Sequence, residues 1–112
     1  MNGIISGKSG VSGGAKSLLI YETITTVRLG TETFIAPFYP VMITIRQSSY
    51  SQDAVINFAS RESKYNTTGV QFWAGGYSYA NCIITWSENT VSVQRTGGQD
   101  IDAGSPVIIL GY

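Results

Sequence analysis

From residue 18 onward, short runs of β-branched and aromatic residues alternate with turns, and this pattern constrains the fold more than any other feature. The runs are rich in Thr, Val, Ile, Tyr and Phe, the residues that favour strands. No window shows a sustained apolar period of 3.6 residues, so almost no helix is predicted. Eight strands are expected, over residues 18–29, 33–36, 41–47, 54–59, 70–74, 80–87, 90–96 and 106–111.

Eight short strands at this spacing predict an all-β fold, an antiparallel β-sandwich or jelly roll with little or no helix. The 112 residues are enough for one domain of ordinary size. Residues 1–17 are rich in Gly, Ser and Lys, so we interpret them as a flexible lead-in. Residues 18–112 are then expected to form a single β-sandwich domain.

One hairpin has a register that the sequence itself specifies. A two-residue loop at Glu88-Asn89 gathers apolar side chains on one face and mostly polar side chains on the other. A slip by one residue would oppose apolar and polar side chains, so the register is well determined. The expected pairs are Trp86 with Val91 and Ile84 with Val93 on the apolar face, and Thr85 with Ser92 and Ile83 with Gln94 on the other.

The last expected strand, residues 106–111, lacks the alternation of apolar and polar residues that a half-buried strand shows. Both of its faces are therefore expected to be buried. Contact with a neighbouring subunit would bury the second face, and so would loops of the same chain. The sequence leaves these two explanations open.

The composition excludes several classes of function. There is no His, which excludes a His-based catalytic triad and imidazole metal ligands. The net charge is zero, which argues against nucleic-acid binding, because phosphate contacts need a basic surface. The lone Cys82 shares a face with Ile84 and Trp86 in the expected hairpin, so we expect a buried, inert thiol. No cofactor or metal site is predicted.

Charged residues make up only 12% of the chain, about half the usual share. Such a low share is unusual for a small protein that stays soluble alone, so we expect another copy or another protein to cover part of the surface. No apolar run approaches the ~20 residues that span a bilayer, and the first residues lack the pattern of a secretory signal. The expected location is the cytosol, or outside the cell after lysis.

Carboxylates are the remaining candidates for acid–base catalysis. Asp100 and Asp102 have the same parity in an extended segment, as a glycosidase pair would need. They lie in a Gly-rich stretch, residues 97–104, that reads as an exposed turn. We therefore favour a solvated loop over a catalytic pair, and we predict that the protein is not an enzyme.

Aromatic side chains among small polar residues are the strongest sign of ligand binding. Residues 72–81 place four large aromatic residues around a Gly-Gly turn, and residues 48–53 and 61–68 form two further aromatic-polar loops. Tyr offers a flat apolar ring and a hydroxyl, which suits sugars and protein partners alike. For any single residue, the alternative that its ring covers core or Gly-rich backbone stays open. The candidate ligand-binding residues are Tyr50, Tyr65, Trp73, Tyr77, Tyr79 and Asn81.

The chain resembles the C-terminal receptor-binding tip, or head domain, of a bacteriophage tail fibre or tail spike. The resemblance is carried by the Gly/Ser-rich residues 2–17, the His-free β-domain, the segment 69–77 and the ending 103–112, where the chain stops after its final strand. It covers most of residues 18–112 and matches no invariant motif, so no functional residue is carried over from the family.

The resemblance implies a homotrimer with β-sandwich heads, carried on the tail of a virion that is assembled in the host cytoplasm. The heads would bind a host-surface glycan or an outer-membrane protein without catalysis, and they would not insert into the membrane. Repeated weak sites on a trimer would raise avidity without new contacts. Two alternatives stay open: a structural decoration or assembly domain of a virion, and a small polysaccharide-degrading fragment.

Overall fold

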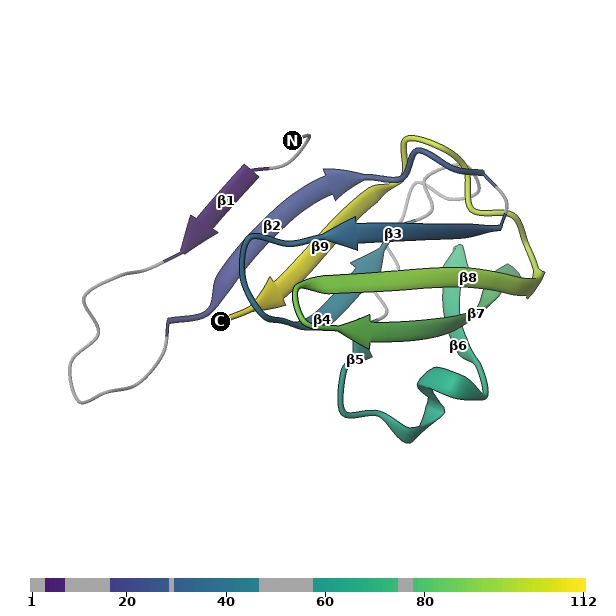
Figure 1. Cartoon of the computed structure of the whole chain (residues 1–112). Coiled ribbons are helices and arrows are strands. Elements are labelled where there is room, and N and C mark those ends of the chain that lie inside the picture. Colours follow the sequence, from purple (N-terminus) through teal and green to yellow (C-terminus); the bar gives the residue numbers. More distant parts are fainter. Residues whose placement is uncertain (1–3, 8–16, 29, 47–57, 75–77) are drawn as a thin grey trace.

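The computed structural model describes residues 4–7, 17–28, 30–46, 58–74 and 78–112. Within them the protein is nearly all-β, as predicted, and its strands form two antiparallel sheets consistent with a β-sandwich (Figure 1). The strands are β1 (Ile4–Gly7), β2 (Leu19–Ile24), β3 (Thr31–Ile35), β4 (Pro40–Ile45), β5 (Phe58–Ser60), β6 (Val70–Ala74), β7 (Ser78–Ser87), β8 (Thr90–Gly98) and β9 (Pro106–Gly111). One short 3-10 helix, η1 (Lys64–Thr67), connects β5 to β6.

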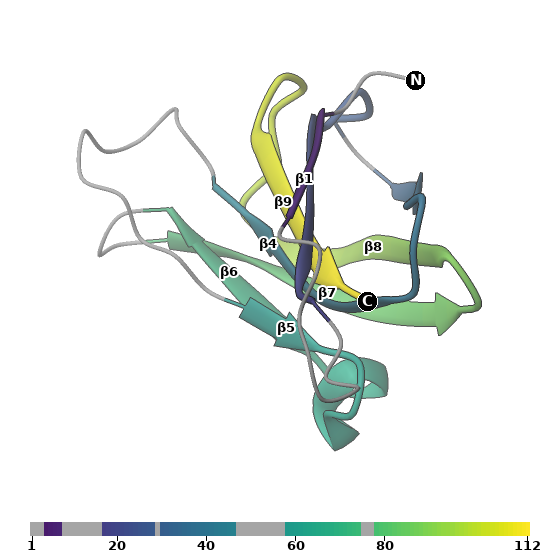
Figure 2. The same cartoon turned by 90° about the vertical axis from the view of Figure 1, so that its left-hand side faces the viewer.

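One sheet has five strands in the order β1-β2-β9-β4-β5, and the other has four in the order β3-β8-β7-β6. Every neighbouring pair is antiparallel. β7 and β8 form the longest pair, and η1 lies below β5 and β6 in Figures 1 and 2. The two sheets therefore each present one face to a shared core and one face outward.

The core is built from alternate residues of the facing strands. Phe72, Ile84 and Val91 come from the four-stranded sheet, and Ile43 and Ile109 come from the five-stranded sheet. All five side chains are at most 1% exposed. The alternation of buried and outward residues confirms that the β-branched runs of the sequence are half-buried strands.

The predicted β7–β8 hairpin is confirmed in its register. Trp86 lies opposite Val91, Ile84 lies opposite Val93, and the polar face follows as predicted. Glu88 adopts a positive φ of 50°, which closes the two-residue loop. β6 and β9 also begin and end where the sequence analysis placed them.

The first expected strand, residues 18–29, is shorter than predicted, because β2 ends at Ile24. Beyond it, Thr25 Oγ1 donates a hydrogen bond to Asp102 O (2.6 Å), and the Glu32 carboxylate accepts one from Thr26 N (2.9 Å). The Glu32 carboxylate therefore occupies backbone N–H groups, those of Thr26 and Val27, that would pair with a neighbouring strand if β2 continued, and the chain turns towards β3. β5 extends to Ser60, one residue beyond the expected strand 54–59, whose residues 54–57 lie outside the described part.

The expected lead-in over residues 1–17 is wrong for Ile4–Gly7, which form β1 and pair with β2. Its first two residues, Ile4 and Ile5, are β-branched, whereas the Ser and Gly that surround them dominated the sequence interpretation. Residues 8–16 of the expected lead-in lie outside the described part.

The prediction that both faces of β9 are buried is wrong within one chain. Val107 and Ile109 point into the core, but Ile108 and Leu110 are only partly buried and Pro106 is exposed. β9 lies between β2 and β4, so its lack of alternation reflects an apolar outer face of this sheet rather than a second core.

Candidate functional site

The pairing of β6 with β7 brings two aromatic rings together on the outer face of the four-stranded sheet. Trp73 lies opposite Tyr79, and the neighbouring Phe72 and Ala80 point into the core. The ring centroids of Trp73 and Tyr79 are 4.8 Å apart, and the ring planes are inclined by 44°. Both side chains are half-buried, so part of each ring is exposed to solvent as an apolar surface.

Two amide side chains flank this aromatic pair on the same face. Gln71 lies opposite Asn81, two positions along the strands from Trp73 and Tyr79. Gln71 Oε1 accepts a hydrogen bond from Trp73 Nε1 (3.3 Å), which leaves its amide nitrogen as a donor towards solvent. Asn81 Nδ2 donates to Thr96 Oγ1 (3.1 Å), which leaves Asn81 Oδ1 as an acceptor.

A β-bulge between β7 and β8 positions Asn81 and Thr96. Asn81 lies opposite Gly97, while Cys82 lies opposite Arg95, so Thr96 is the additional residue. Its hydroxyl returns a hydrogen bond to Asn81 O (3.1 Å), which closes a two-way link between the residues. The bulge therefore holds the Asn81 side chain beside the aromatic pair.

We name the surface formed by these side chains the aromatic-amide platform; its members are Gln71, Trp73, Tyr79, Asn81 and Thr96. None of them is charged, and the neighbouring outward positions Ile83, Thr85, Ser92 and Gln94 are also neutral. The platform therefore offers stacking surface and amide hydrogen bonds without a strong electrostatic field. Among the described residues, no group of three or more acidic or Cys side chains is placed to hold a metal ion.

The structure places three of the six predicted ligand-binding residues together: Trp73, Tyr79 and Asn81. Tyr65 lies on η1, 58% exposed, with its ring 5.2 Å from Lys64 Nζ. Its carbonyl accepts a hydrogen bond from the N–H of Gly69 (2.9 Å), the residue directly before β6. Tyr50 and Tyr77 lie outside the described residues.

Two members of the platform, Gln71 and Thr96, were not among the predicted ligand-binding residues. Gln71 has the same parity as Trp73 within β6, so its position on the outer face was readable from the sequence. Thr96 reaches Asn81 only because of the bulge, for which the sequence carries a weak signal, the Gly pair at residues 97–98.

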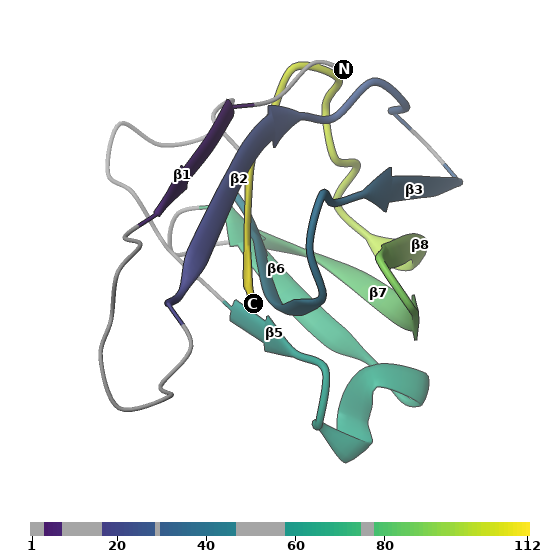
Figure 3. The ribbon, with the colours of Figure 1, turned by 60° about the vertical axis from the view of Figure 1, so that its left-hand side comes forward.

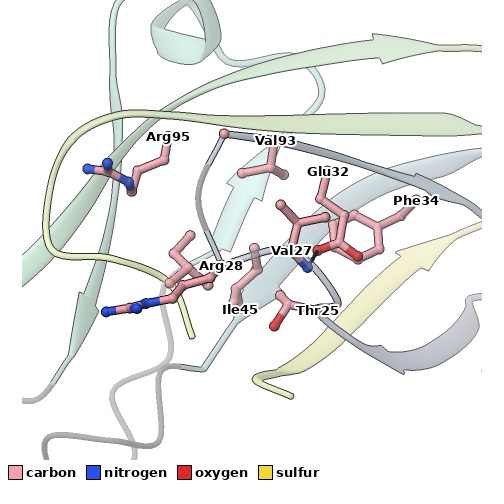
Figure 4. A pocket seen from close by; sticks show the side chains of 10 residues that line it. Thr25, Val27, Arg28, Glu32, Phe34, Ile45, Val93 and Arg95 are labelled. Atoms are coloured by element: carbon pink, nitrogen blue, oxygen red, sulfur yellow. Dashed lines mark hydrogen bonds between the residues drawn. The ribbon is translucent and has the colours of Figure 1, made fainter. Parts of the chain in front are cut away.

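A second cluster of polar groups lies at one end of the sandwich, beside a small, partly open cavity of about 20 Å³ (Figure 4). Asp100 bridges Arg28 (3.2 Å) and Arg95 (3.7 Å) there. Both guanidinium groups point away from the apolar side chains of Phe34 and Val93 in Figure 4. The cavity has room for about one water molecule, so this cluster reads as a structural ion-pair network.

Asp100 and Asp102, the candidate catalytic pair, do not face an open cleft. Asp100 is held in the ion-pair network, and the Asp102 carbonyl accepts hydrogen bonds from Thr25 Oγ1 (2.6 Å) and Ser105 Oγ (2.7 Å). Cys82 is fully buried, as predicted, and desolvation raises the pKa of its thiol to about 12. Among the described side chains, the platform is thus the best candidate for binding a ligand.

No protein-family model matches the chain, and no curated protein and no solved structure is significantly similar to it. Within the part of the chain that the structure describes, no helix is long and apolar enough to cross a membrane.

Proposed function

We propose that this protein is a non-catalytic adhesion module that binds a cell-surface glycan through the aromatic-amide platform. The observation that supports the proposal is the close, tilted pair of Trp73 and Tyr79, flanked by amides on an open sheet face. The apolar face of a pyranose ring stacks on such a pair, while its hydroxyl groups bond to the amide groups of Gln71 and Asn81.

The absence of charge on the platform points to neutral sugars as the ligand class. An acidic polysaccharide would need cations to offset the desolvation of its carboxylates, and the described residues of the platform supply none. A single shallow site of this size binds weakly, because stacking and a few hydrogen bonds must offset the entropy of association. Several copies displayed together would raise the avidity.

A panel of neutral and acidic glycans tests this proposal. Wild-type protein is expected to bind neutral members, and Trp73→Ala is expected to weaken that binding at least tenfold through lost stacking. Thr85→Ala, a change on the same sheet face away from the platform, serves as the matched control and should bind normally. Equal binding by Trp73→Ala and wild type would remove the platform from the proposal.

The proposed setting is a virion tail, where the protein would attach a phage to its host. This setting rests on the resemblance to tail-fibre heads and on the low charge of the chain, and it includes the homotrimer as a prediction. Whole-cell binding by the intact oligomer tests it. If no candidate host cell is bound, the attachment role is wrong even where a free glycan binds the platform.

A structural assembly domain is a second candidate function, and a different surface favours it. The outer face of the five-stranded sheet is apolar, with Ile24 and Phe58 about half exposed and Ile108 and Leu110 partly exposed. Large apolar patches usually mark contact surfaces. An assembly domain would bind a purified virion protein through this face and would ignore host cells.

A further inference from the structure

β3 is the outermost strand of the four-stranded sheet, so one of its edges lacks a neighbouring strand in the described structure. Residues of an antiparallel pair alternate between those that exchange hydrogen bonds with the partner and those that do not. A hydrogen bond from Ala36 N to Asn89 O (2.8 Å) sets this alternation for β3 and β8. The backbone N–H and C=O groups of Thr31, Thr33 and Ile35 therefore point away from β8, towards the open edge of the sheet.

This open edge lacks the features that usually prevent edge strands from pairing. β3 contains no Pro, Lys or Arg, and its register with β8 is continuous, without a bulge. The carboxylate of Glu32, its one charged residue, accepts hydrogen bonds from Thr26 Oγ1 (2.8 Å) and Val27 N (3.0 Å). That charge stabilises the preceding turn. Ile35 adds a 66% exposed apolar side chain at the edge.

A groove of about 380 Å³ runs beside this edge, between β3 and β2. Figure 3 shows β1 and β2 in one layer and β3 in the other, so the groove opens between the two sheets. Its walls combine apolar side chains with Thr hydroxyls, and their one carboxylate is already hydrogen-bonded. The lining residues are Tyr21, Thr23, Ile24, Thr26, Glu32, Thr33, Phe34 and Ile35.

We propose that the β3 edge and this groove bind one extended, uncharged peptide segment of a partner protein, as an added antiparallel strand. Only a β-strand places N–H and C=O groups at the spacing that Thr31, Thr33 and Ile35 require. The segment is uncharged because the groove provides no counter-ion for a buried charge. Its alternate side chains are apolar where they face Tyr21 and Phe34.

A folded second copy fits this site less well than a single segment. In a symmetric dimer that pairs β3 with β3, the β2 strand of each copy lines the groove beside the shared edge. The β2 strands of the two copies would therefore be brought towards each other. A single extended segment carries no second sheet, so it enters the groove without a clash against β2. The site is separate from the aromatic-amide platform, and its occupation does not depend on glycan binding.

A capped peptide of alternating Thr and Val is the probe, and titration followed by amide chemical shifts is the measurement. Hydrogen-bonded residues of an antiparallel pair lie directly opposite one another and share a face. Thr amides of the probe should therefore face Thr31, Thr33 and Ile35, while its Val side chains enter the groove. N-methylation of the Thr amides is expected to lower the affinity at least tenfold, and N-methylation of the Val amides to preserve it.

A pair of protein variants tests the same contact from the other side. Thr33→Pro removes the outward N–H and is expected to weaken probe binding about tenfold, whereas Thr33→Val keeps the N–H and the affinity. Thermal unfolding establishes whether both variants fold. If Thr33→Pro does not fold, the methylated probes alone test the proposed hydrogen bonds. The proposal is overturned if the probe does not bind, or if methylated Thr amides bind as well as unmodified ones.

Hydrogen exchange separates the two possible occupants of the edge. The Thr33 amide is expected to exchange rapidly in the free protein and slowly at probe saturation. Protection that is already present in the free protein and falls on dilution would show that a second copy closes the edge. That result would overturn the proposal of a partner segment.

Discussion

Cys82 shows how strongly the chemistry of a single residue depends on its place in the sandwich. Its side chain lies in the core, next to the bulge of β7 and β8, and is fully buried. Desolvation raises its thiol pKa from 9.0 to about 12, although the nearby charge of Arg95 acts in the opposite direction. The thiol is therefore protonated at neutral pH, and it acts as a small apolar group.

This pKa predicts how stability changes with pH. An unfolded chain loses the Cys82 proton near pH 9, whereas the folded chain keeps it to about pH 12. The contribution of the protonated thiol to the free energy of unfolding is therefore complete below pH 9. It is lost between pH 9 and 12, by about 1.4 kcal/mol per pH unit. Chemical denaturation at pH 8, 9 and 10 measures it. Cys82→Ala, which lacks the thiol, is the reference, and equal pH slopes for both proteins would contradict the prediction.

Arg61 links three segments through one guanidinium group. Its Cζ lies 3.9 Å from the ring centroid of Tyr39, and its Nη1 donates to Pro40 O (3.1 Å) and Glu88 O (2.9 Å). Lys cannot supply the planar group that both stacks and donates in two directions. Arg61→Lys is therefore expected to lower the free energy of unfolding by about 1–2 kcal/mol in urea denaturation.

The control for that change is Arg28→Lys. Arg28 is 67% exposed and contacts Asp100 at 3.2 Å, so a Lys there keeps most of a weak surface pair. Its effect should stay within about 0.5 kcal/mol. If Arg61→Lys lowers the free energy of unfolding by no more than this, the planar shape of the Arg61 guanidinium adds nothing to stability beyond its charge.

At the scale of elements, the bulge in β8 connects the fold to the candidate site. Gly98 has a φ of +73°, and a Cβ at this position would overlap with the carbonyl oxygen of Tyr79. Gln99 N also donates to that oxygen (2.7 Å), so the backbone of Tyr79 is fixed from two sides. The ring of Tyr79 thus owes its place beside Trp73 to a glycine on the neighbouring strand.

Gly98→Ala is expected to destabilise the protein by about 2 kcal/mol and to displace Tyr79, since both the positive φ and the overlap are unfavourable for Ala. Gly97→Ala is the matched control, because a Cβ at Gly97 meets no atom within 4 Å. Thermal unfolding measures the stability, and tryptophan fluorescence, recorded in a Trp86→Phe background so that only Trp73 emits, reports the contact with Tyr79. Similar effects of the two substitutions would show that the bulge does not require Gly98.

Elements with strong local patterns were predictable from the sequence. The β7–β8 register followed from apolar parity around Glu88 and Asn89, and β6 and β9 are bounded by Gly, Ser and Pro. β1 was not predicted because its stability comes from pairing with β2, and the composition of β1 alone does not indicate that contact. Beyond the end of β2, the chain bonds to Asp102 and to the Glu32 carboxylate, and these contacts cannot be read from the composition of β2.

The candidate site was predictable in part. Three of its residues were selected because aromatic and amide side chains cluster in the sequence, but the meeting of Trp73 with Tyr79 depends on the β6–β7 register. The sequence indicated a turn after β6 but did not specify which residues of the two strands pair. The contribution of Thr96 depends on a one-residue bulge, and the position of a bulge follows from long-range packing.

At the scale of the whole molecule, the two outer faces differ in chemistry. The four-stranded sheet presents the neutral platform, while the five-stranded sheet presents a largely apolar face interrupted by Glu22, Thr44 and Ser60. The apolar members of this second face are Ile20, Ile24, Met42, Phe58, Ile108 and Leu110. One face suits a hydrated ligand and the other suits contact with protein.

This difference predicts where copies of the chain associate. If the protein forms the expected homotrimer, the apolar face is its contact surface, and a charge placed there should break the assembly. Ile108→Lys is expected to lower the mass from about three times 12.1 kDa to the mass of one chain, as measured by light scattering at micromolar concentration. Ile108 is only partly buried, so a single chain should tolerate Lys at this position.

Thr85→Lys is the control, because it adds the same charge to the outer face of the four-stranded sheet. It should leave the mass unchanged, since that face stays exposed in the expected assembly. A wild-type mass equal to one chain would refute the trimer, and it would leave the apolar face to a different protein. Dissociation by Thr85→Lys would instead place the contact on the platform side, where a buried platform could no longer reach a glycan.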